Sequence, residues 1–235
     1  MVTCSRLLDR RMKYWGYMVQ GDTKKAQILI MLELQDSMNT KVNQQWRLQN
    51  FEWYRAIWVE CAELMDHYGW KWWKKQQPDF EQVQLELIDI WHFGLSDLLN
   101  ATSDSDELAE NLARALAEKH MAADFHVTLE IFVQKTLEQR AFDLSAFIRL
   151  LAAAELDFPA LYRGYIGKNV LNFFRQDNGY LKGSYSKVWN GREDNEHLVE
   201  LMVQLDSNSP TFKSDLYNAL SERYQIIQDT DFSVP

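Results

Sequence analysis

Apolar residues recur every three or four positions along most of the chain, which is the spacing of one face of an α-helix. The first strong segment spans residues 23–42. A second segment, residues 51–67, is apolar nearly all round, which is typical of a buried helix, and Gly69 is expected to end it. A proline–aspartate pair at 78–79 then predicts the start of a third helix that reaches about Leu99.

The same spacing continues through the second half of the chain, where short polar breaks separate the apolar segments. Further helices are predicted at 104–122, 124–139, 144–156, 159–178, from about 195 to 205, and at 210–227. Residues 1–22, with breaks at Gly16 and Gly21, form an N-terminal extension to which we assign no role, and residues 229–235 form a tail. The pattern therefore predicts an all-α multi-helix bundle of eight or nine helices.

Composition agrees with this prediction and narrows the class of protein. The 235 residues are 46% hydrophobic and 13% aromatic, and only 4 prolines and 9 glycines occur, which argues against a turn-rich β fold. The formal net charge of -9 argues against a general nucleic-acid surface, because phosphate backbones need a basic footprint. No stretch approaches the about 18–20 apolar residues of a membrane span, and Cys4 and Cys61 suggest no disulfide framework. We therefore expect a cytoplasmic protein that binds neither nucleic acid nor membranes.

Two acidic pairs lie on faces that otherwise consist of core residues. Glu60 and Glu63 belong to the second predicted helix and Glu86 and Asp89 to the third, and residues three apart share a helix face. The neighbours of Glu60 and Glu86 at helical spacing are Trp53, Ala56, Ile57, Leu64, Val83, Ile90 and Phe93. Four carboxylates in such surroundings are costly to bury without a positive charge. A hard cation such as Mg²⁺ is their natural partner.

A second group of residues is basic. Lys168, Asn172 and Arg175 are spaced i, i+4 and i+7, so they share one helix face. Three more basic residues follow, namely Lys182, Lys187 and Arg192. Lysine and arginine are standard partners of phosphate oxygens. A solvated basic face would explain this group alone, but beside a four-carboxylate metal site a phosphate-rich substrate explains both groups.

Two other features admit two interpretations each. Gln35 and Asn39 are i, i+4 partners on one side of the first strong helix, where amides could read the donor and acceptor edge of a base or could simply face solvent. The aromatic and basic segment 70–75 could stack a base and attract phosphates, or it could be a corner whose tryptophans pack.

The order of these motifs resembles a known family. Glu-x-x-Glu, a gap of 22 residues and Glu-x-x-Asp resemble the all-α nucleoside triphosphate pyrophosphohydrolases. The segments 60–66, 70–74, 86–93, 168–172, 174–180 and 191–195 resemble the dimeric dUTP diphosphatases within that superfamily. A lone Glu-x-x-Glu is weak evidence, whereas the ordered series between about Leu34 and Leu201 is highly specific.

This resemblance implies hydrolysis of dUTP, and often dUDP, to dUMP by a homodimer, which keeps uracil out of DNA and supplies dUMP for thymidylate synthesis. It implies two or three Mg²⁺ ions, with Mn²⁺ as a substitute, held by Glu60, Glu63, Glu86 and Asp89. It assigns the phosphates to Lys168, Asn172, Arg175, Tyr180 and Lys187, and the nucleoside to Gln35, Asn39, Trp72 and His92. Residues 23–228 would form the catalytic domain, with a mobile part around 158–205 that closes over substrate.

The expected chemistry is in-line attack of water on a phosphorus atom next to bound metal ions. Glu60 or Glu63 is expected to accept the proton of that water, with Glu60 preferred. The basic group would stabilise the leaving phosphate, and Trp72 is a candidate for excluding a ribose 2′-hydroxyl. Whether the acids of segment 191–195 touch metal or brace a loop stays open.

Three alternatives remain at this point. A related pyrophosphohydrolase with another base preference would be separated by a panel of nucleotides. A di-iron carboxylate bundle is suggested by Asp89-x-x-His92, which adds a nitrogen ligand at helical spacing, and iron content would settle it. A non-catalytic helical interaction module predicts no metal binding and leaves the buried acids unexplained.

Overall fold

The computed structural model describes the backbone of residues 5–118, 121, 123–206, 209 and 211–231, and side chains for the part of these ranges from 23 to 227. The helices are α1 (Ser5–Val42), α2 (Trp53–Tyr68), α3 (Phe80–Ala101), α4 (Ser105–Ala115), α5 (Phe125–Gln139), α6 (Leu144–Ala153), α7 (Phe158–Asp177), α8 (Asp194–Gln204) and α9 (Phe212–Asp231). Two 3-10 turns, Trp46–Leu48 and Tyr180–Lys182, and the short strands β1 (Val188–Trp189) and β2 (Arg192–Glu193) complete the regular structure of the described ranges. The all-α prediction is confirmed.

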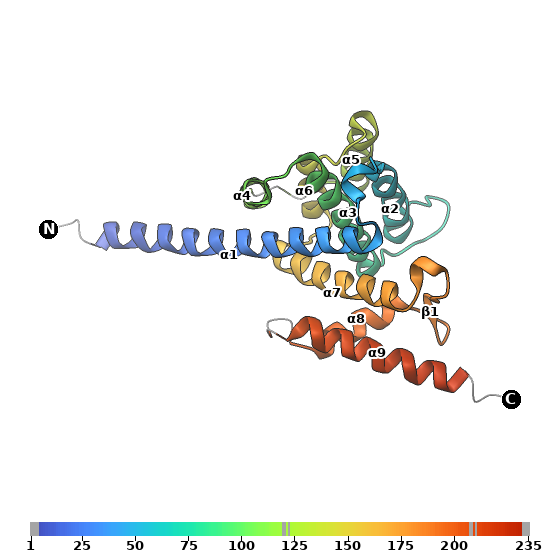
Figure 1. Ribbon diagram of the computed structural model, residues 1–235. Helices are drawn as coiled ribbons and strands as arrows, with labels where there is room; N and C mark the ends of the chain where they lie inside the picture. The colour runs from blue at the N-terminus through green and yellow to red at the C-terminus, as the bar shows by residue number, and fades with distance from the viewer. Residues whose placement is uncertain (1–4, 119–120, 122, 207–208, 210, 232–235) are drawn as a thin grey trace.

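The long helix α1 lies between two groups of helices (Figure 1). In that view α2, α4, α5 and α6 are on one side of α1 and α7 to α9 are on the other, α3 passes behind α1, and the N-terminal part of α1 extends beyond both groups. Buried side chains from both groups and from α1 join in one hydrophobic cluster. Among the described helices none is long and apolar enough to cross a membrane.

Aspartate side chains cap the start of five helices, which explains why the sequence places the starts so well. The caps are Asp79 of α3, Asp104 of α4, Asp124 of α5, Asp143 of α6 and Asp157 of α7, and each accepts a backbone N–H from the first turn. At the other end of α2, Gly69 adopts φ 91°, so the predicted end of that helix is confirmed.

The structure differs from the sequence prediction at two helix boundaries. The helix α1 continues through Gly16 and Gly21, where breaks were predicted, because a glycine costs a helix only about 1 kcal/mol and does not end it. The helix α4 ends at Ala115 instead of near 122. Its last carbonyls accept hydrogen bonds in the turn that follows, from the backbone N–H groups of residues 116–118.

The relative positions of three helices build the site. α2 and α3 lie side by side, joined by the loop at 69–79, and α7 packs across α3. The close approach of α7 depends on Gly164, because a Cβ atom there would overlap the side chain of Ile88 on α3. One turn further along α7, this approach brings Lys168 next to Asp89 of α3.

Candidate active site

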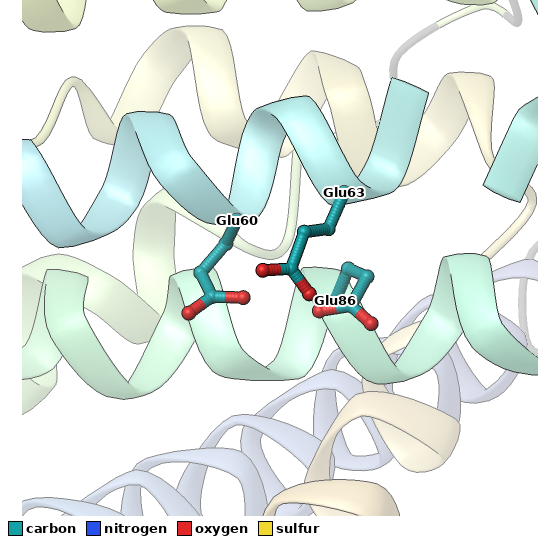
Figure 2. Close-up of side chains that lie close together, drawn as sticks. All are labelled: Glu60, Glu63 and Glu86. Atoms are coloured by element: carbon teal, nitrogen blue, oxygen red, sulfur yellow. The ribbon is translucent and has the colours of Figure 1, made fainter. Parts of the chain in front are cut away.

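Three carboxylates converge between α2 and α3. Oxygens of Glu60, Glu63 and Glu86 all lie within 4.8 Å of one another, and Figure 2 shows the two side chains of α2 pointing toward that of α3. Glu86 is only 5% exposed, Glu60 is half-buried and Glu63 is exposed. Three of the four acids predicted from helical spacing therefore meet at one point.

The electrostatics of this cluster favour the binding of a cation. Burial, and then the charge of Asp89, raises the pKa of Glu60 to about 7 and that of Glu86 to about 9. Because the pKa of Glu86 lies above neutral pH, the cluster retains a proton when no cation is bound. Oxygen donors in this number and spacing fit a hard divalent cation, whose charge would let all the carboxylates ionise.

The fourth predicted ligand, Asp89, is held differently. Its Oδ2 forms an ion pair with Lys168 Nζ at 2.8 Å, and the ammonium group also donates to Asn195 Oδ1 at 2.9 Å. Lys168 is only 2% exposed, so this pair lies within the protein. Asp89 thus lies beside the carboxylate cluster, but its charge is paired with the ammonium group of Lys168.

Arg175 is fixed by an acid that sequence reasoning did not single out as a site residue. Its Nε and Nη2 donate to the two oxygens of Asp194 at 2.8 and 2.6 Å, and Asp194 is 0% exposed. Asp194 Oδ2 also accepts the hydroxyl of Tyr185 at 2.8 Å, while Arg175 Nη1 donates to Asn172 Oδ1 at 3.1 Å. Within the segment 191–195, Asp194 therefore braces Arg175 and Tyr185.

The two predicted amides form a buried network with two residues that the sequence did not point out. Gln35 Nε2 donates to Asn39 Oδ1 at 3.1 Å and to Ser96 Oγ at 2.9 Å. Asn39 Nδ2 donates to Ser96 Oγ at 3.0 Å, and the Tyr165 hydroxyl donates to Gln35 Oε1 at 3.0 Å. Helices α1, α3 and α7 each contribute, so no local spacing in the sequence signals this network.

His92 adjoins this network. Its ring stacks on Tyr165 with centroids 4.2 Å apart, and its Nδ1 lies 2.8 Å from the carbonyl oxygen of Ile88. Burial lowers the pKa of His92 to about 4, so the ring is neutral, Nδ1 carries the proton and Nε2 is an acceptor. Within the described part of the chain, this buried Nε2 has no hydrogen-bond partner.

Two adjoining cavities connect these groups. The first, of about 340 Å³, is lined by Gln35, Asn39, His92 and the aromatic side chains of Trp46, Trp53 and Phe93. The second, of about 680 Å³, contains the three clustered carboxylates together with Lys168. Glu60, Asp89, Arg175 and Lys187 line both cavities. An apolar pocket with amides therefore opens into a pocket of acids and bases.

The remaining predicted residues divide between the rim and the surface. Lys187 lies over the ring of Tyr180, with Nζ 5.7 Å from the centroid, and both line the first cavity. Asn172 lines the same cavity. Trp72 is 90% exposed and lines neither of these cavities, so the structure does not bring it to the other nucleoside candidates.

Comparison with protein-family models identifies a family for most of the chain. A family model described as dUTPase matches residues 27–180, which is more than half of the chain. The match includes every predicted site residue except Lys187, and it ends before Asp194. No curated protein matches the chain.

Proposed function

The chain belongs to the dUTPase family and is a dUTP diphosphatase, and on that premise we propose a Mg²⁺-dependent hydrolysis of dUTP and dUDP to dUMP at the two adjoining cavities. One observation carries the proposal: the amides of Gln35 and Asn39 line a cavity that shares four residues with the cavity of the carboxylate cluster. This arrangement suits a molecule with a uracil at one end and phosphates at the other. Such an activity keeps uracil out of DNA and supplies dUMP for thymidylate synthesis.

The hydrogen bonds around the amides suggest how uracil is selected. Both N–H groups of Gln35 donate within the network. Its Oε1 accepts one hydrogen bond, from Tyr165, and retains one lone pair for a ligand, and Asn39 Nδ2 donates one N–H and retains the other. An acceptor beside a donor complements the N3–H and O4 of uracil. Cytosine presents an acceptor and a donor in the opposite order, so it would leave both amides unpaired.

His92 is proposed to contact the sugar. Its Nε2 is an acceptor that lines the same cavity and has no partner among the described residues. A deoxyribose hydroxyl is the donor that a nucleoside in this cavity would offer. The proposed contact of Trp72 with the nucleoside stays a prediction. Its side chain is exposed on the loop between α2 and α3.

Glu60, Glu63, Glu86 and Asp89 would hold the Mg²⁺ ions, two or three in number, and Mn²⁺ would substitute. The bound metal supplies charge neutralisation and a lower pKa of the attacking water. Glu60 or Glu63 then accepts the proton of this water, and Glu60 lines both cavities. Asp89 can serve as a ligand once Lys168 turns from it toward a phosphate oxygen.

The phosphates would be received by Lys168, Asn172, Arg175, Tyr180 and Lys187. Arg175 and Asn172 are oriented by their own hydrogen bonds, so they need little reorganisation to stabilise charge on the leaving phosphate. Lys187 and Tyr180 lie in the segment after α7, which is proposed to move over the substrate.

We also propose that the enzyme is a cytoplasmic homodimer. The loop between α2 and α3 presents the side chains of Trp70, Trp72 and Trp73 to solvent, and a second copy could cover them. Light scattering coupled to size-exclusion chromatography tests the dimer, and a mass equal to that of one chain would contradict it.

The decisive experiment is product analysis of the purified protein with Mg²⁺ and dUTP, dUDP, dCTP, dTTP or UTP. Release of dUMP from dUTP and dUDP, with little reaction of the others, is the expected result. Hydrolysis of several triphosphates would keep the carboxylate mechanism but overturn the role of Gln35 and Asn39. Turnover of dUTP that survives exhaustive chelation would overturn the metal requirement.

A further inference from the structure

His67 lies at the edge of the carboxylate cluster, and the function proposed above does not use it. It follows Glu63 by four residues and Glu60 by seven, so the three share one face of α2. Its carbonyl oxygen accepts the backbone N–H of Asp79 at 2.9 Å, which ties this end of α2 to the start of α3. The side chain is 36% exposed and lines the same cavity as the carboxylates.

The imidazole faces the most buried acid of the cluster. His67 Nε2 lies 3.6 Å from Glu86 Oε1. A metal ion bound at about 2.0–2.2 Å to both a nitrogen and a carboxylate oxygen holds these two atoms roughly 3 Å apart. The observed separation needs to shrink by only a few tenths of an ångström, which a partly exposed side chain can accommodate.

We propose that His67 Nε2 is a ligand of a metal ion bound to Glu86, and that this nitrogen shifts the preference of the centre from Mg²⁺ toward Mn²⁺. The inference rests on the proposed function, since it requires the carboxylate metal centre. Mg²⁺ is satisfied by oxygen ligands and keeps its waters. An imidazole in the ligand set favours first-row transition metals over Mg²⁺, and among these metals Mn²⁺ suits a site whose other ligands are carboxylates and water.

The direct test is pulsed electron paramagnetic resonance of the full chain loaded with Mn²⁺ alone. We expect a nitrogen coupling to the bound Mn²⁺ that changes to the ¹⁵N pattern when the protein is labelled with ¹⁵N-histidine. The coupling should disappear in His67→Gln. It should persist in His126→Gln, a matched control on α5 whose Nε2 lies 2.9 Å from the carbonyl oxygen of Gly69.

Titration of the same proteins with metal gives a second, independent readout. His67→Gln should weaken Mn²⁺ binding about tenfold or more, while Mg²⁺ binding, measured by competition with Mn²⁺, changes much less. Bound Mn²⁺ without nitrogen coupling in the wild-type protein would overturn the role of His67 and leave the proposed function intact. Failure of Mn²⁺ and Mg²⁺ to bind at all would overturn both.

Discussion

Glu63 offers the cleanest single-residue test of the metal centre. Its oxygen lies within 4.8 Å of those of Glu60 and Glu86, yet its side chain is exposed, so glutamine removes the charge without disturbing the core. We expect Glu63→Gln to lower kcat on dUTP with Mg²⁺ by about a hundredfold or more. Steady-state kinetics measure this effect. Glu130→Gln, equally exposed on α5, should keep full activity, and normal turnover by Glu63→Gln would remove Glu63 from the ligand set.

Tyr165 tests the selection of uracil without touching the proposed contacts to the base. Its hydroxyl shares one proton between Gln35 Oε1 and the carbonyl oxygen of Met31, so Tyr165→Phe removes the hydrogen bond to the Gln35 oxygen while the N–H groups of Gln35 keep their partners. We expect kcat/KM for dUTP to fall about five- to tenfold, since one buried hydrogen bond is worth about 1 kcal/mol and the Gln35 oxygen is then held less firmly. The preference for dUTP over dCTP should fall with it.

Tyr162→Phe is the matched control for this experiment, because Tyr162 lies on the same helix and does not line the cavity of the amides. It should keep both the rate and the preference. An unchanged dUTP-to-dCTP ratio in Tyr165→Phe would show that the hydroxyl does not orient Gln35.

At this scale the sequence revealed the groups whose partners are local and missed those whose partners are distant. Glu60 and Glu63 share a helix face by spacing alone, and their apolar neighbours signalled burial. Tyr165 and Ser96 reach Gln35 only because α7, α3 and α1 pack together, 130 and 61 residues apart in sequence. The ion pair of Lys168 with Asp89 has the same origin, so it could not be predicted either.

At the scale of elements, the buried acids between α2 and α3 lower the free energy of unfolding by an amount that depends on pH. The pKa of Glu60 is raised to about 7 and that of Glu86 to about 9, mainly by burial, from ordinary values near 4.5. The folded chain therefore keeps protons that the unfolded chain has released above about pH 5. Its stability must fall as pH rises from about 5 to 9.

We expect the melting temperature in a chelator to decline across this range and to recover when Mg²⁺ is added at pH 8. Differential scanning calorimetry measures both effects. Glu86→Gln should flatten the decline, because it removes the group with the higher pKa. A decline of equal slope in Glu86→Gln would show that other groups cause it.

A buried ion pair is one of the contacts that link α7 to α8. Arg175 donates twice to Asp194, and removing one partner of such a pair leaves a buried charge that costs about 3–5 kcal/mol. We expect Asp194→Asn to lose free energy of unfolding on this order in urea titrations. Asp215→Asn, at an exposed position on α9, should change it by less than about 1 kcal/mol. Equal losses in the two variants would contradict the bracing role of Asp194.

Helix ends follow local chemistry, which explains both the success and the failures of the sequence at this scale. An aspartate cap or Gly69 satisfies backbone groups within one turn, so those boundaries could be predicted. Gly16 and Gly21 suggested breaks, but they lower helix propensity only slightly, so the full length of α1 could not be predicted. The ribbon of β1 and β2 is too short for any alternating pattern.

At the scale of the whole molecule, the two halves of the site come from different groups of helices. The clustered carboxylates belong to α2 and α3, whereas the proposed phosphate ligands belong to α7 and the segment after it. Direct contacts between these groups at the site include the ion pair of Lys168 with Asp89. A substrate with metal-bound phosphates would bridge the groups and replace this pair.

Bridging of this kind should order the segment 178–193, which carries Tyr180 and Lys187 at the rim of the first cavity. We expect hydrogen–deuterium exchange of this segment to slow when Mg²⁺ and a non-hydrolysable dUTP analogue are both present, and to stay fast with either alone. The segment contains Gly179 and Gly183 in left-handed conformations, and most of its side chains are exposed, so its free state opens readily. α5 and α6 contribute no residue to either cavity and serve as the internal control. If the exchange rate of 178–193 does not change with the ligands, the phosphates are bound without closure of this segment, by residues already fixed on α7.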